Sequence, residues 1–79
     1  MNYQEFGKFI KQLRQGQKIS QQTMANHLCI SRATLSGFEN GVSGEIGFKK
    51  VLQIVDYLGY ELNLKEMSAF PVFEEVIDG

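Results

Sequence analysis

The chain has 79 residues, of which 43% are hydrophobic and 22% charged, as is typical of one small globular domain with no membrane-spanning segment. A single cysteine, Cys29, excludes an internal disulfide, and the first residues lack the basic-then-apolar pattern of a signal peptide, so we expect a cytoplasmic protein. The net charge of −1 argues by itself against a nucleic-acid partner, but it averages +4 over residues 1–50 and −5 over residues 51–79.

The first predicted element is an amphipathic helix that starts near residue 2. Asn2 and Glu5 have the spacing of a capping box, which begins a helix, and Gly16 is suited to end it. The apolar residues between them recur at helical spacing and are Tyr3, Phe6, Phe9, Ile10 and Leu13. This stripe predicts a helix with one buried face.

Two short helices are predicted next, with a tight turn between them. Ser20 and Ser31 are of the residue type that accepts hydrogen bonds from the first turn of a helix. The four residues 27–30 between the two helices leave room only for a helix-to-helix turn. Two short helices joined in this way are typical of a helix-turn-helix.

A fourth helix and one strand are predicted after a glycine-punctuated loop. The apolar pattern of the helix is made by Phe48, Val51, Leu52, Val55 and Leu58, and Gly59 is suited to end it. From residue 60 to residue 65 the period changes to two, with Tyr60, Leu62 and Leu64 on one face. Because no other segment has a strand pattern, we expect these three residues to pair with the same strand of a second copy, across a homodimer axis.

The last segment, residues 66–79, is acidic but also carries apolar side chains. One interpretation is that it docks on a partner protein, with Phe70 and Phe73 as anchors. A second is a disordered or self-packing terminus. A third is that its negative charge folds back over the basic part of the chain.

The segment from Ile19 to Gly41 resembles the helix-turn-helix of the Cro/C1-repressor (XRE) family. The features that carry the resemblance are Ser20-Gln21, Ala25, Ile30-Ser31 and Glu39-Asn40-Gly41. The resemblance implies an all-α, lambda-repressor-like helix-turn-helix bundle over residues 1–59. The strand of residues 60–65 would pair across a homodimer, and residues 66–79 would form an acidic tail. It also implies an ion pair between Arg14 and Glu39. Cys29 stands where the family usually has glycine, so either the turn differs or backbone strain is accepted.

The same resemblance implies a set of DNA contacts. Ser20 and Gln21 match phosphate-contacting positions at a helix N-terminus. Positions that face outward and read bases are matched by Arg32, Ala33, Ser36 and Gly37. Further contacts to the DNA backbone are implied for Thr34 and Asn40, with Lys49 or Lys50 reaching a flanking phosphate. Of these, Arg32 has the chemical reach for a bidentate contact with guanine O6 and N7.

The run from Leu58 to Leu64 further resembles HipB-type antitoxins, which are small dimeric autorepressors. This resemblance implies a bacterial, cytoplasmic repressor, associated with the nucleoid when it is bound to a near-palindromic operator. It also implies a HipA-like kinase toxin as partner. The alternatives are a free-standing phage-type or host regulator of the XRE family, or a protein-interaction module that has lost DNA binding.

An enzyme is not expected. The chain has a single histidine, His27, and a single cysteine, Cys29, whereas zinc needs three or four ligands. Nor does so short a chain offer a cleft for a nucleophile and its base. The sequence therefore predicts no metal, no cofactor, no small-molecule substrate and no membrane partner.

Overall fold

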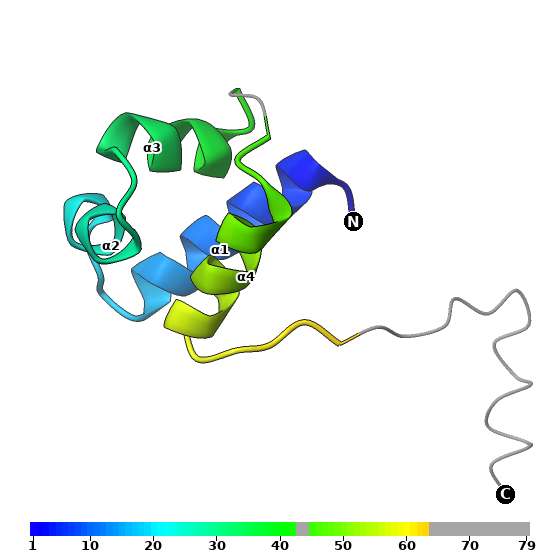
Figure 1. Ribbon diagram of the computed structural model, residues 1–79. Coiled ribbons are helices and arrows are strands. Elements are labelled where there is room, and N and C mark those ends of the chain that lie inside the picture. The colour runs from blue at the N-terminus through cyan, green and yellow to red at the C-terminus, as the bar shows by residue number, and fades with distance from the viewer. Residues whose placement is uncertain (43–44, 64–79) are drawn as a thin grey trace, which may run out of the picture.

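The computed structural model describes residues 1–42 and 45–63, which contain four helices joined by short connections (Figure 1). The helices are α1 (Tyr3–Gly16), α2 (Gln21–Leu28), α3 (Arg32–Asn40) and α4 (Phe48–Tyr57). The predicted all-helical class is thereby confirmed. Within these residues no helix has both the length and the apolar character that a membrane span requires.

Local side-chain chemistry sets where the first three helices begin. The capping box of α1 is formed, because Asn2 Oδ1 accepts from the backbone N–H of Glu5 at 2.8 Å and Glu5 Oε1 accepts from the N–H of Asn2 at 3.0 Å. Ser20 and Ser31 each accept from the N–H three residues later, at 3.0 and 2.9 Å. These contacts supply partners for N–H groups that the helix itself leaves unpaired.

The core lies where α1, α2 and α3 meet the inner face of α4. Its buried hydrophobic residues are Ile10, Met24, Ala25, Leu28, Leu35, Phe38, Ile54, Val55 and Leu58. Phe38 is fully buried, and the rings of Tyr3 and Phe6 lie edge-on to it at centroid distances of 5.5 and 6.0 Å. Gly7 allows this approach, because a Cβ there would overlap the carbonyl oxygen of Phe38. The α1–α3 contact therefore fixes the position of α3.

The chain after α4 differs from the prediction. Gly59, with φ of +89°, turns the backbone at the end of α4. Residues 60–63 form no strand, and Leu64 and Lys65 lie outside the described residues. A strand needs a neighbouring strand for its backbone hydrogen bonds, and the expected neighbour belongs to a second copy, whereas the structure is of one chain. Tyr60 and Leu62 are both exposed.

Candidate nucleic-acid interface

A buried ion pair anchors α3 to α1. Arg14 Nε lies 2.7 Å from Glu39 Oε2, and Arg14 Nη2 donates to Glu39 Oε1 at 2.9 Å, so the contact is bidentate. Both side chains are buried. The remaining Nη1 of Arg14 donates to the carbonyl of Ile19 at 2.7 Å. The structure thus brings together the two residues for which the family resemblance implies an ion pair, and Arg14 also holds the turn that leads into α2.

Gln21 extends this contact to the surface of α3. Its Nε2 donates to Glu39 Oε1 at 2.9 Å, and its Oε1 accepts from Arg32 Nε at 3.4 Å. Gln21 is half-buried, whereas Arg32 is exposed. A continuous set of polar contacts therefore runs from the buried Arg14–Glu39 pair through Gln21 to the first residue of α3. The amide of Gln21, implied as a phosphate contact, is occupied within the protein.

The outer face of α3 presents the residues implied in base and backbone contacts. Arg32, Ala33 and Asn40 are exposed, and Thr34 and Ser36 are half-buried. Asn40 Nδ2 donates to Ser36 Oγ at 3.2 Å, so these two side chains form one polar unit near the end of the helix. The face thus combines one arginine at its start with small polar groups along its length.

Lys11 lies beside this face, although it is not among the DNA-contacting residues predicted above. Its Nζ donates to Asn40 Oδ1 at 3.4 Å, which places a positive charge of α1 next to the end of α3. The spacing contains a usable signal, because Lys11 lies three residues before Arg14 and so on a neighbouring part of the same helix face. Once Arg14 is paired with Glu39, Lys11 is expected near the residue that follows Glu39.

The capping hydroxyls are close to this surface and are already hydrogen-bonded. Ser20 is exposed at the start of α2, and its Oγ donates to Thr23 Oγ1 at 2.9 Å. In the same way Ser31 Oγ donates to Thr34 Oγ1 at 2.8 Å. Each serine thus serves the helix that it begins, and a phosphate at either helix start would meet these hydroxyls together with the first backbone N–H groups of that helix.

Gly37 does not face outward, so its predicted placement is wrong. The residue is buried, and its carbonyl accepts from the N–H of Val42 at 3.0 Å. That bond forms where Gly41, with φ of +71°, ends α3 and the chain returns over the helix. Gly37 is therefore buried where the chain turns back after α3, and it offers no exposed surface there for a base contact.

Lys50 is engaged inside the protein, whereas Lys49 is exposed. Lys50 Nζ donates at 2.9 Å to the carbonyl of Leu28, the last residue of α2. A positive charge at that end of a helix is favourable, because the terminal carbonyls carry partial negative charge. His27 Nδ1 also lies 2.8 Å from Tyr57 Oη, so α4 holds the end of α2 at two points. Lys50 thus has a structural contact that the sequence did not predict.

The turn between α2 and α3 follows the family geometry in spite of its cysteine. Cys29 has φ of +59° and ψ of +40°, the left-handed conformation that glycine adopts without strain. Of the two possibilities open at the sequence level, the strained turn is the one formed. The Cys29 side chain is exposed. In the described part of the chain no group of three or more His, Cys, Asp or Glu side chains is placed to hold a metal ion.

Three predicted contact residues, Leu64, Phe70 and Phe73, lie outside the described residues.

Comparison with known protein families identifies the domain that carries this surface. The family model described as "Helix-turn-helix domain" matches residues 7–66, which include most of α1 and all of α2, α3 and α4. Neither curated proteins nor solved structures gave a match. The matched region is most of the chain and contains every described residue discussed above except those before residue 7. The chain therefore belongs to the helix-turn-helix family, as a DNA-binding regulator of the XRE type.

Proposed function

We propose that this protein is a transcriptional repressor that reads DNA sequence with the start of α3. The observation that carries the proposal is the placement of Arg32. It is exposed at the first position of α3, and its Nε is held by Gln21, which is itself held by the buried Glu39. A side chain restrained in this way loses less conformational entropy on binding than a freely rotating arginine does.

The geometry of Arg32 suits a guanine. With Nε occupied by Gln21, the two Nη groups of the guanidinium make no hydrogen bond to the residues that the structure describes. They can donate to O6 and N7 of one guanine in the major groove, a contact that discriminates against a wrong base by about 1–3 kcal/mol. Ala33, the next exposed residue, offers its methyl group to a thymine methyl. Base reading thus rests mainly on one side chain per protomer.

Contacts to phosphates would supply the rest of the affinity. We assign two of these contacts to the first turns of α2 and α3, where Ser20 and Thr34 lie. A third is assigned to Asn40, at the C-terminal end of α3. Of the two lysines, Lys49 is the better candidate for the contact with a flanking phosphate, because the ammonium group of Lys50 already donates to the end of α2. Seven of the eight lysines and arginines lie in residues 1–50. Since each neutralised phosphate releases counterions, affinity should fall steeply with salt.

A homodimer would double this reading surface. We propose that Tyr60, Leu62 and Leu64 pair with their counterparts in a second copy, as a two-stranded ribbon. Two recognition helices would then meet half-sites about 34 Å apart on a near-palindrome. A protein that sediments as a single protomer on a full operator would contradict this part of the proposal.

The finer role that we propose is that of a HipB-like antitoxin, which represses its own operon in the bacterial cytoplasm. Its partner would be a HipA-like kinase, docked on residues 66–79 through Phe70 and Phe73. A kinase gene beside the gene for this protein, and co-purification that is lost when both phenylalanines are changed to serine, would support this role. Without such a neighbour, the protein is a free-standing regulator.

The test of DNA binding is a fluorescence anisotropy titration with DNA from the promoter of the protein's own operon. We expect Arg32→Ala to weaken binding at least tenfold, while Lys8→Ala, which removes an exposed positive charge from α1, weakens it much less. Circular dichroism should show both variants folded, since both side chains are exposed. Equal affinity of the parent and Arg32→Ala would refute α3 as the reader, and binding without salt dependence would favour a protein-interaction module.

A further inference from the structure

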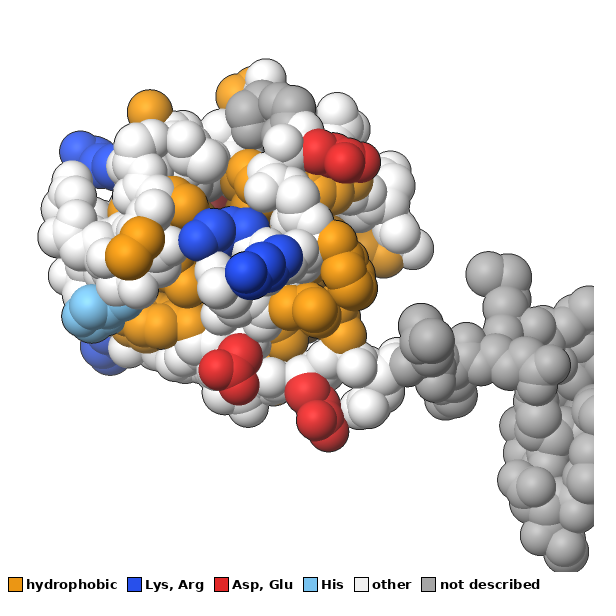
Figure 2. All heavy atoms as spheres, in the orientation of Figure 1, with side chains coloured by type: hydrophobic (Ala, Val, Ile, Leu, Met, Phe, Trp, Pro, Cys, Tyr) orange, Lys and Arg blue, Asp and Glu red, His pale blue; other side chains and the backbone are white. Residues whose placement is uncertain are grey.

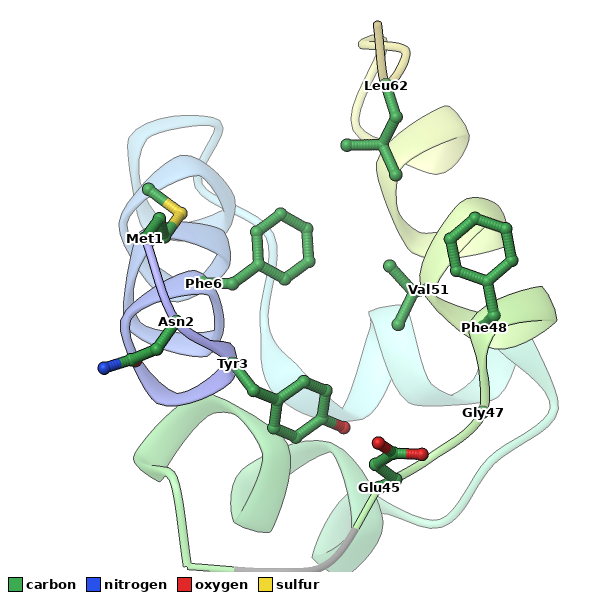
Figure 3. Close-up of a pocket in the computed structure, with 9 residues that line it drawn as sticks. All are labelled: Met1, Asn2, Tyr3, Phe6, Glu45, Gly47, Phe48, Val51 and Leu62. Atoms are coloured by element: carbon green, nitrogen blue, oxygen red, sulfur yellow. The ribbon is translucent and has the colours of Figure 1, made fainter. Parts of the chain in front are cut away.

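An apolar groove runs between α1 and α4 on the side where the described chain ends. It consists of two cavities that share Phe6 and Leu62. The larger has a volume of about 390 Å³. Figure 3 shows Tyr3 and Phe6 of α1 and Val51 of α4 pointing into it from opposite sides. We call this feature the α1–α4 groove.

The groove collects most of the apolar surface that the described residues leave exposed. Among the described residues, seven large hydrophobic side chains are exposed, and five of these seven line the groove. These five, with their exposed fractions, are Met1 (81%), Phe48 (70%), Tyr60 (53%), Leu62 (46%) and Phe9 (43%). Because Tyr60 and Leu62 are also proposed to pair across the dimer, the surface left for another occupant is mainly that of Met1, Phe48 and Phe9. Scattered apolar residues are normal on a protein surface, but a contiguous patch of this kind marks a surface that something covers.

The chain itself continues directly from this groove. Leu62 lines both cavities, and the described residues end at Asn63, after which 16 residues remain in the sequence. Even with the short rise of a helix, 16 residues extend about 24 Å. Since α4, which borders the groove, has 10 residues and is about 15 Å long, the remaining segment is long enough to return along it.

The composition of that segment fits the groove. Phe73 and Ile77 lie four residues apart, so that in a helix begun by Pro71 they share one face, and Phe70 directly precedes that helix. Residues 64–79 also hold four acids and one base, for a net charge of −3. Figure 2 shows basic side chains immediately beside the hydrophobic patch on this face of the molecule. The exposed Lys49 directly follows Phe48 of the groove, whereas the two charged residues that line the cavities, Glu45 and Glu61, are acidic. The apolar side chains of the segment, rather than its charge, therefore fit the groove itself.

Tethering favours the chain's own segment over one from another molecule. A short flexible connection gives an effective concentration on the order of millimolar. The connection from Asn63 to Phe70 has only six intervening residues. The same segment of a second copy, present at micromolar concentration, competes for the groove at a concentration about a thousandfold lower. The same contact within one molecule is therefore preferred.

We propose that residues 66–79 fold back into the α1–α4 groove of their own chain, with Phe70 and Phe73 filling its cavities. The contact closes the exposed apolar face of a domain whose own core is small. It goes beyond the DNA-binding role, because neither α2 nor α3 lines the groove. Since a partner kinase is proposed to take the same two phenylalanines, groove and partner compete for them.

The test uses the full chain, which contains no tryptophan, with Phe73→Trp as the only reporter. We expect its emission in the native protein to lie at shorter wavelength than in urea, as for a buried indole. Adding Phe48→Ser should shift the emission toward the urea value. The matched control is Val42→Ser, since Val42 is 80% exposed but lines neither cavity, and it should leave the emission unchanged.

Three results would overturn the proposal. A native emission equal to that in urea would show that the segment does not cover the groove, which would then be open to a partner protein or stay empty. A short-wavelength emission that appears only as concentration rises, together with a dimer in sedimentation, would assign the groove to a second copy. An emission unaffected by Phe48→Ser, in a variant shown by circular dichroism to be folded, would place the segment elsewhere. The titration with promoter DNA is a separate measurement, so failure of the proposed function would be recognised independently.

Discussion

The buried Arg14–Glu39 pair offers the sharpest test of how this small fold is held together. Replacing Glu39 with glutamine keeps the shape of the side chain but removes its charge. In the parent, the two carboxylate oxygens accept three hydrogen bonds, two from Arg14 and one from Gln21. An amide has only one acceptor oxygen, and its NH₂ group would face donors. The guanidinium of Arg14 would remain buried without its counter-charge.

The expected loss is large compared with the stability of the domain. Removing one partner of a buried ion pair costs about 3–5 kcal/mol, because the other charge is left uncompensated. At about 0.05–0.15 kcal/mol per residue, a chain of this length has a free energy of unfolding of about 4–12 kcal/mol. The substitution therefore removes a large fraction of the total stability, and at the low end of that range it unfolds the protein.

Urea unfolding followed by circular dichroism measures this loss. For an m-value of about 1–2 kcal/mol/M, the midpoint of Glu39→Gln should fall by more than about 1 M. Glu45→Gln is the matched control, because Glu45 is exposed, and its midpoint should stay close to that of the parent. Replacing both partners, as Arg14→Met with Glu39→Met, should recover much of the stability, since no charge is then left buried. A loss of less than about 1 kcal/mol in Glu39→Gln would refute the reasoning.

Three further predictions concern positions where the backbone or a single contact sets the outcome. Cys29→Gly should raise the melting temperature by a few degrees, because relief of a left-handed conformation costing about 1–2 kcal/mol exceeds the entropy cost of glycine, about 0.5–1 kcal/mol; a lower melting temperature would contradict this. Gly7→Ala should destabilise by about 1–3 kcal/mol in urea unfolding, because its Cβ has no room against α3, whereas Gly16→Ala, with open space around it, should be neutral or stabilising; equal effects would refute the close crossing. Lys50→Ala should lower the free energy of unfolding by about 1 kcal/mol and leave the salt dependence of DNA binding nearly unchanged. Lys49→Ala should leave the stability unchanged and make the slope of log affinity against log salt concentration shallower by about 1. The reverse pattern would reassign the two lysines.

Local chemistry made much of the fold predictable. The capping box at Asn2, the serines before α2 and α3, and the apolar stripe of α1 act over three or four residues, so the sequence displays them directly. The Arg14–Glu39 pair links distant positions and was reached through the family resemblance rather than through spacing. Its presence shows that the resemblance extends to the packing of α1 on α3.

The features that could not be predicted depend on how helices cross. The hydrogen bonds from Lys50 to the end of α2 and from Gln21 to Glu39 join residues 22 and 18 positions apart, and no local pattern specifies them. The outward placement of Gly37 follows from the family pattern of contact positions, which does not specify how the chain packs after Gly41, where the N–H of Val42 donates to the carbonyl of Gly37. The expected strand at residue 60 requires a second copy, which the sequence of one chain indicates but one chain cannot form.

The measurement that tests the central claim most directly compares the parent with Arg32→Lys on two duplexes, the operator and a scrambled sequence of equal length. Lysine keeps the positive charge but lacks the fork that binds O6 and N7 of guanine together. If Arg32 reads a base, the ratio of the two affinities should fall at least tenfold in Arg32→Lys, while affinity for the scrambled duplex stays nearly the same. An unchanged ratio would contradict the claim that α3 reads DNA through Arg32.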